Sequence, residues 1–69
     1  GQLTDRERQI IEMICDEKTP REIARYLNIS EATVHVHKRN VMIKLGVKGN
    51  IGILRYALSE GLFRNSRAI

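Results

Sequence analysis

The chain has 69 residues, a length that allows one small domain and no second hydrophobic core. Hydrophobic residues make up 42% of it, with one Phe, two Tyr and no Trp, so the core must be built from Ile, Leu and Val. The composition offers no apolar run of membrane-spanning length, no secretory signal and only the lone Cys15. These features argue against membrane-spanning and disulfide-stabilised classes and favour a cytoplasmic protein.

The net charge of +4 is unevenly distributed along the chain. Residues 1–29 carry five basic and six acidic groups, whereas residues 30–50 carry four basic groups against Glu31 alone. A concentration of positive charge on one segment is typical of proteins with a polyanionic partner. For the charges alone, a solvated surface that serves solubility is the better explanation.

The first predicted helix runs from Asp5 to about Asp16. Thr4 and Glu7 have the spacing of a capping box, in which a hydroxyl and a carboxylate satisfy the first free backbone N–H groups. The apolar residues recur at helical spacing and predict this buried stripe: Ile10, Ile11, Ile14 and Cys15.

Two short amphipathic helices follow within residues 19–45, joined by a three-residue turn. The first opens with Thr19, Pro20 and Glu22, which supply an N-cap hydroxyl, a proline at the first helical position and the glutamate of a capping box. Asn28 lies where the chain must turn, because asparagine tolerates the left-handed conformation. Ser30 is the expected N-cap of the second helix.

The residues that pack the two helices against each other have the spacing that the turn between them requires. Ala24 is small where the two helices must cross closely, and Ile29 and Val34 can fill the space between them. A small residue, a turn residue and two space-filling residues in register are typical of a helix-turn-helix, a structure that binds DNA. The sequence therefore predicts DNA binding.

The second helix of the pair, residues 31–45, is expected to bury one face and present the other. At about 100° per residue, four residues form the expected buried stripe: Val34, His37, Val41 and Leu45. The opposite face carries Ala32, His35, Val36, Arg39 and Ile43.

Three outward residues have the chemistry of base recognition. Arg39 can bind the O6 and N7 atoms of guanine, Val36 can pack on a thymine methyl group, and His35 can donate to a base or a phosphate. Simple solvation of these side chains is the alternative. His35 and His37 cannot chelate one metal, because residues two apart on a helix point in nearly opposite directions.

Phosphate contacts are expected from residues beside this outward face and from the two helix N-termini, whose free backbone N–H groups attract anions. The predicted set is Thr19, Arg21, Thr33, Lys38, Asn40, Lys44 and Lys48.

A fourth helix is predicted from Ile51 to Glu60, after Gly46 ends the third and residues 47–50 make a turn. This helix carries more apolar surface than one packed face can bury. The residues expected in the core are Leu54, Ala57 and Leu58. Ile53 and Tyr56 are expected partly outward and, with Gly52, to form a dimerisation surface.

The predicted fold is therefore an all-α four-helix bundle whose second and third helices form the helix-turn-helix. The domain is assigned to residues 1–63, and residues 64–69 are expected to be a disordered tail.

The order of these residues resembles the LuxR-type DNA-binding domain of NarL/FixJ response regulators and quorum-sensing regulators. The resemblance spans residues 3–63. It is carried by Leu3-Thr4, Arg6-Glu7, Glu22-Ile23-Ala24, Leu27, Ile29-Ser30, Thr33-Val34, His37, Lys44-Leu45-Gly46-Val47, Tyr56-Ala57 and Gly61-Leu62. It implies a transcriptional regulator whose third helix enters the major groove and whose fourth helix commonly dimerises. By position, it implies base contacts from His35, Val36 and Arg39 and a phosphate contact from Lys44.

The chain departs from the family pattern at several positions. Glu17 stands where the family usually has glycine, and Pro20 where it often has asparagine. Ala32 replaces a frequent lysine. The residues Gly49, Asn50 and Gly52 replace the usual Ser, Arg and Glu, so the start of the fourth helix lacks a strong cap.

The expected partners are double-stranded DNA with an inverted-repeat operator and a second copy of the chain on that DNA, with RNA polymerase as a further candidate. No cofactor, metal or membrane partner is expected.

A sigma-factor-like promoter-reading domain is one alternative function, although such domains usually end at the recognition helix. A protein-interaction module that uses the basic helix is another. The sequence shows no nucleophile paired with a base, no plausible carboxylate pair and no glycine-rich phosphate loop, so nothing in it suggests an enzyme.

Overall fold

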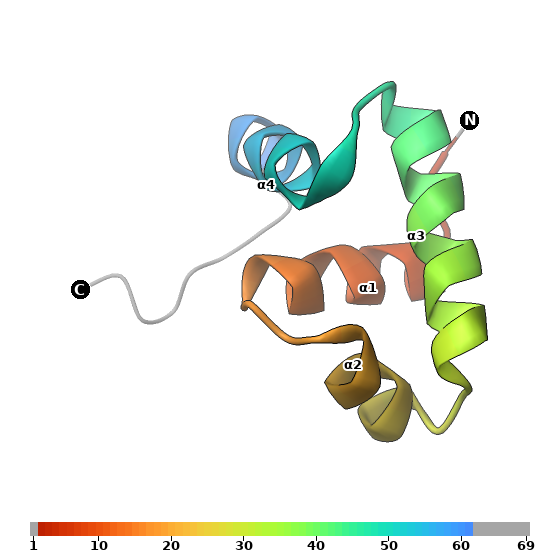
Figure 1. Ribbon diagram of the computed structural model, residues 1–69. Coiled ribbons are helices and arrows are strands. Elements are labelled where there is room, and N and C mark those ends of the chain that lie inside the picture. Colours follow the sequence, from red (N-terminus) through yellow and green to blue (C-terminus); the bar gives the residue numbers. More distant parts are fainter. Residues whose placement is uncertain (1, 62–69) are drawn as a thin grey trace.

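The computed structural model describes residues 2–61, which contain four α-helices and no β-strand (Figure 1). The helices are α1 (Asp5–Cys15), α2 (Pro20–Leu27), α3 (Glu31–Leu45) and α4 (Gly49–Glu60). The predicted all-α fold with a helix-turn-helix is therefore confirmed, and only α4 begins earlier than expected. The predicted tail at residues 64–69 lies outside the described residues.

Local side-chain chemistry fixes where three of the helices begin. The Thr4 hydroxyl accepts a 3.0 Å hydrogen bond from the Glu7 N–H, and the Thr4 N–H donates to the Glu7 carboxylate at 2.8 Å. Thr19 and Glu22 form the same reciprocal capping box before α2. Ser30 caps α3 by accepting from the Thr33 N–H at 3.0 Å. The start of α4 has no side-chain cap, as the sequence indicated.

Left-handed residues end the helices and set the turns. Asn28 ends α2 at φ 59°, and Gly46 ends α3 at φ 68°. In each case the next residue donates a backbone hydrogen bond back into the last helical turn, from Ile29 to the Ala24 carbonyl and from Val47 to that of Met42. This pattern is the Schellman motif, which redirects the chain sharply after a helix.

One aliphatic core joins the four helices. α1 packs against α3 and α4, while α2 packs against α3, so that α3 stands at the edge of the domain with α2 at one end and α4 at the other (Figure 1). Among residues 2–61, nine hydrophobic residues are buried: Ile10, Ile11, Ile14, Ile23, Ala24, Val34, Val41, Ile53 and Ala57. The predicted stripe of α1 is confirmed at its three isoleucines, and Cys15 is half-buried.

The expected orientation of α4 was wrong at two positions. Ile53, which we expected partly outward, is fully buried, and Leu58, which we expected in the core, is 58% exposed. The reason is a tight contact beside Gly52, where an added Cβ would lie 2.8 Å from the Cβ of Val47. This contact turns the side of α4 that carries Gly52 and Ile53 inward. Tyr56 is half-buried.

Candidate nucleic-acid interface

The outward face of α3 presents the three predicted base-contacting residues to solvent. His35, Val36 and Arg39 are all exposed. Val36 is 54% exposed and Ile43, one turn beyond Arg39, is 68% exposed. A helix face that leaves apolar side chains uncovered beside an arginine is suited to reading base edges, which offer both hydrogen-bonding groups and the thymine methyl.

The inner face of α3 holds the helix firmly enough to present those residues. Val34 and Val41, seven residues apart, are at most 1% exposed and belong to the core. His37 and Leu45 are half-buried, so His37 lies at the margin of the core rather than inside it. Ala24 is buried where α2 crosses α3, as expected for a helix-turn-helix.

The residues predicted to bind phosphate differ in how far they are exposed to solvent. Five of them are exposed: Thr19, Arg21, Asn40, Lys44 and Lys48. Thr33 and Lys38 are half-buried. The hydroxyls of Thr19 and Thr33 lie at the N-termini of α2 and α3, where they take part in capping.

Lys44 has a partner inside the domain that sequence reasoning missed. Its ammonium donates to the Glu7 carboxylate at 2.8 Å and to the backbone carbonyl of Gln2 at 3.1 Å. Glu7 is only 4% exposed and is the single buried charged residue among those described. The two residues are 37 positions apart, so no local pattern in the sequence could have paired them. In the sequence alone, the capping box with Thr4 already accounts for Glu7.

The carboxyl of Glu7 titrates below its ordinary value. The hydrogen bond from Lys44 lowers the pKa of this carboxyl most, and the backbone hydrogen bond from Thr4 lowers it further, against the opposing effect of burial. The carboxylate is therefore stabilised in its charged form by donors from α3 and from its own helix start.

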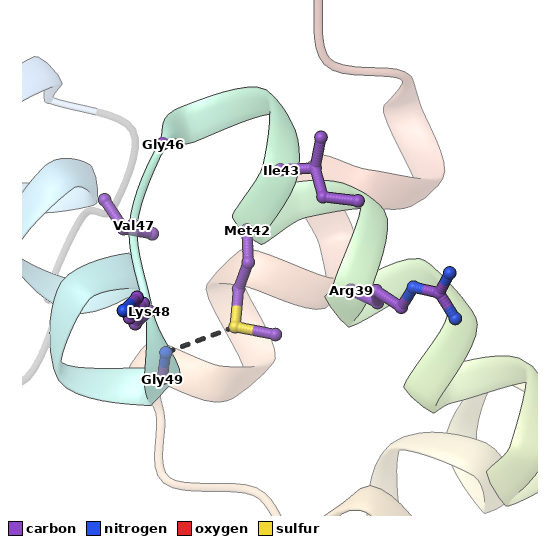
Figure 2. Close-up of a pocket in the computed structure, with 7 residues that line it drawn as sticks. All are labelled: Arg39, Met42, Ile43, Gly46, Val47, Lys48 and Gly49. Carbon is purple, nitrogen blue, oxygen red and sulfur yellow. Dashed lines mark hydrogen bonds between the residues drawn. The ribbon is translucent and has the colours of Figure 1, made fainter.

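An open depression of about 460 Å³ lies where α3 passes into α4 (Figure 2). Its lining residues are Arg39, Met42, Ile43, Gly46, Val47, Lys48 and Gly49. Within it, the Gly49 N–H donates to the Met42 sulfur at 3.2 Å. The depression continues the outward face of α3 and has a cation, Arg39 or Lys48, on either side of its apolar floor.

Residues 2–61 contain no cluster of three or more His, Cys, Asp or Glu side chains able to hold a metal ion. None of their four helices combines the length and apolarity that crossing a membrane requires.

Taken with the fold, this surface defines a helix-turn-helix DNA-binding domain: a capped helix pair in which the second helix is anchored by its inner face and presents a basic, partly apolar outer face. The family model of bacterial regulatory proteins, luxR family, matches residues 1–57. The chain therefore belongs to the luxR family of bacterial regulatory proteins, whose function is DNA-binding transcription regulation.

Individual relatives agree with this assignment. The chain is 44% identical over 62 residues to YgeK of Escherichia coli K12, an uncharacterized response regulatory protein. It is 55% identical over 47 residues to the spore germination protein GerE of Bacillus subtilis, which covers 68% of this chain.

Solved structures share the fold. The structure of the transcription factor GerE superimposes with a TM-score of 0.83 at 35% identity, covering 90% of this chain and 92% of that one. The LuxR-type receptor VqmA of Vibrio cholerae gives a TM-score of 0.84 at 30% identity over 88% of this chain.

The similarity covers only part of most of these relatives. The chain spans 42% of the length of YgeK, 64% of GerE and 28% of the VqmA chain.

Proposed function

We propose that the domain binds double-stranded DNA sequence-specifically by inserting α3 into the major groove. The observation that carries this proposal is the exposed set of His35, Val36 and Arg39 on a helix whose opposite face is fixed in the core by Val34 and Val41. A major groove is wide enough for an α-helix, and each base pair presents a distinct pattern of donors, acceptors and methyl groups there.

The roles of the individual side chains follow from their chemistry. Arg39 reads guanine through two parallel hydrogen bonds, Val36 packs on a thymine methyl, and His35 donates to a base edge or a phosphate. Phosphates are held around this face, by hydrogen bonds and charge, from Thr19, Arg21, Thr33, Lys38, Asn40 and Lys48, together with the N-termini of α2 and α3. Lys44, from which the family resemblance implies a phosphate contact, is left out of this set, because its ammonium already has Glu7 as a partner.

We propose that two copies bind together on DNA through α4. Two residues of the surface first expected for this role are not free to make it. Ile53 is buried, and the side of Gly52 on which a Cβ would stand faces Val47 of the same chain. The apolar side chains that remain free on α4 are Ile51, 73% exposed, and Leu58, 58% exposed. They are seven residues apart and so lie on nearly one face. Two-fold pairing through this face favours an inverted-repeat operator.

The parent protein is proposed to be a cytoplasmic transcriptional regulator of the response-regulator type, with this domain as its output module. The family assignment and the similarity to the response regulatory protein YgeK support that role. A non-enzymatic mode of action and contact with RNA polymerase at the promoter belong to the same proposal.

Selection of bound duplexes from a random pool tests the function directly. The chain should enrich one motif with two inverted half-sites, and the enriched duplex should shift in a gel at physiological salt more strongly than a shuffled duplex. Binding without any enriched motif would contradict sequence recognition. No binding to any duplex would favour a protein partner for the basic helix instead.

A further inference from the structure

A network of three hydrogen bonds connects the start of the domain to the last turn of α3. A single oxygen of the Glu7 carboxylate accepts both the Thr4 N–H and the Lys44 ammonium, each at 2.8 Å. The same ammonium donates to the Gln2 carbonyl at 3.1 Å. Residues 2–7 and the end of α3 are therefore joined through two charged groups.

The ammonium of Lys44 is directed inward by this network. The Glu7 side chain is 5% exposed and therefore buried, whereas Lys44 is an exposed residue whose side chain keeps 28% of its surface in water. An ammonium has three donors, and two of them are already used inside the domain. Drawing Lys44 out to a phosphate would leave the Glu7 carboxylate buried without its cation, which is strongly unfavourable.

The position of the pair on α3 gives it a consequence for base reading. Lys44 lies five residues after Arg39, about 7.5 Å further along the helix axis. The fully buried contacts of α3, Val34 and Val41, lie before this last turn. Hydrophobic contacts are non-directional. A short hydrogen bond between charged groups has a defined geometry. Met42 and Leu45 also pack this last turn against the core, through apolar contacts. The ion pair adds the directional contact between this turn and α1.

We propose that Glu7, acting through Lys44, is a positioning residue for sequence recognition: the ion pair fixes how α3 is presented, and Lys44 serves this pair rather than a DNA phosphate. Glu7 itself touches no DNA in this arrangement. The role rests on the proposed DNA-binding function.

The test compares Glu7→Gln, Lys44→Met and the double variant with the wild-type chain, using the duplex enriched by selection and a shuffled duplex of the same length. Lys48→Met is the matched control, since Lys48 is an exposed lysine beside the same surface. Binding is measured at several salt concentrations, at a temperature where circular dichroism shows every variant folded. Lys44→Arg, which can keep the ion pair, supplies the readout if Glu7→Gln does not fold.

We expect Glu7→Gln and Lys44→Met each to lower the ratio of specific to shuffled binding by about fivefold or more, a loss comparable to one mismatched base pair. The double variant should lose no more than either single one, and Lys44→Arg should restore the ratio. Lys44→Met should leave the slope of log K against log salt unchanged. Lys48→Met should make that slope shallower by about one and keep the ratio, because it removes one phosphate contact.

The direction of the Glu7→Gln effect separates positioning from simple electrostatics. Removing a negative charge near DNA should raise binding to every sequence, whereas lost positioning lowers the preference for one sequence. An unchanged ratio in Glu7→Gln, together with a shallower salt slope in Lys44→Met, would overturn the proposal and assign Lys44 to phosphate. Failure of the wild-type chain to enrich any motif would instead count against the proposed function, which the same experiment reports separately.

Discussion

Gly52 and Val47 are in contact across the turn that joins α3 to α4. A Cβ on Gly52 would lie 2.8 Å from the Cβ of Val47, closer than two such carbons approach in folded proteins. Val47 is partly buried and its backbone is fixed by the hydrogen bond to Met42, so it cannot move aside easily. The glycine, which looks unfavourable in a helix, allows this approach and sets the rotation of α4.

The first prediction follows from this contact. Gly52→Ala should destabilise the domain by about 1 kcal/mol, because the strain of overpacking exceeds the helix propensity gained by alanine. Chemical denaturation measures the effect. Asn50→Ala is the control, since Asn50 is exposed in the first turn of the same helix and should tolerate alanine. Equal stabilisation by both substitutions would show that the contact is not tight in solution.

Glu17 adopts a left-handed conformation, with φ 62°, two residues after α1 ends at Cys15. The hydrogen bonds from Glu17 to the Ile14 carbonyl and from Lys18 to that of Met13 form the Schellman motif there. Glycine has no Cβ penalty in this conformation, which costs other residues roughly 1–2 kcal/mol. Part of that gain is lost to the greater backbone freedom of an unfolded glycine.

Glu17→Gly should therefore raise the free energy of unfolding by about 0.5–1 kcal/mol. The comparison is Asn28→Ala, at φ 59°, where a tolerant residue is replaced by an intolerant one and stability should fall. Thermal denaturation of both variants decides the matter, and a loss of stability in Glu17→Gly would contradict the explanation.

The sequence predicted the helices well because their ends are specified locally. Thr19 with Glu22, Asn28 and Ser30 each act within three or four residues, so their roles are visible without the fold. The inner face of α3 was predictable in part: Val34 and Val41 recur at helical spacing and are buried, although the outer face also carries the apolar Val36 and Ile43.

The errors arose where a role depends on distant residues. α4 is apolar on several sides, so hydrophobicity alone did not determine whether Ile53 or Leu58 would be buried; contact with Val47 did. The partner of Lys44 lies 37 residues away at the start of α1. Such pairs have no local signature, and a lysine at the end of a recognition helix resembles any other phosphate-binding cation.

The lowered pKa of Glu7 predicts how stability depends on pH. The folded state favours the carboxylate more than the unfolded state does, so this contribution is complete above the ordinary value of 4.5 and is lost as pH falls through the lowered folded pKa. The wild-type chain should exceed Glu7→Gln in stability by about 1.5–3 kcal/mol at neutral pH, the range for hydrogen bonds to charged groups.

Urea denaturation of both proteins from neutral pH to below 4.5 tests this dependence. The difference in unfolding free energy should narrow only on the acid side. A difference that stays constant with pH would mean that Glu7 stabilises the fold by shape and packing rather than by its charge.

Arg39 provides the test of base reading. Arg39→Ala should weaken binding to the selected duplex by about 1–3 kcal/mol and relax the preference at one base pair, because a bidentate contact with guanine is lost. Lys48→Ala should weaken selected and shuffled duplexes alike. Affinity measured on single-base variants of the operator distinguishes the two effects, and equal losses on all duplexes in Arg39→Ala would remove its assigned role.

The last prediction concerns assembly on DNA. Ile51 and Leu58 leave an apolar strip on α4 that is too small for a stable interface by itself, so we expect the free domain to be a monomer or a weak dimer. A DNA duplex with two half-sites supplies the missing binding energy, because it holds two copies with their recognition helices about 34 Å apart. Leu58→Glu should therefore leave the fold and single half-site binding intact while abolishing cooperative binding to the full operator. Sedimentation of the chain, alone and with one-half-site and two-half-site duplexes, measures both states. One domain per two-half-site duplex at saturation, in the wild-type chain, would contradict the dimer and leave α4 as a packing element alone.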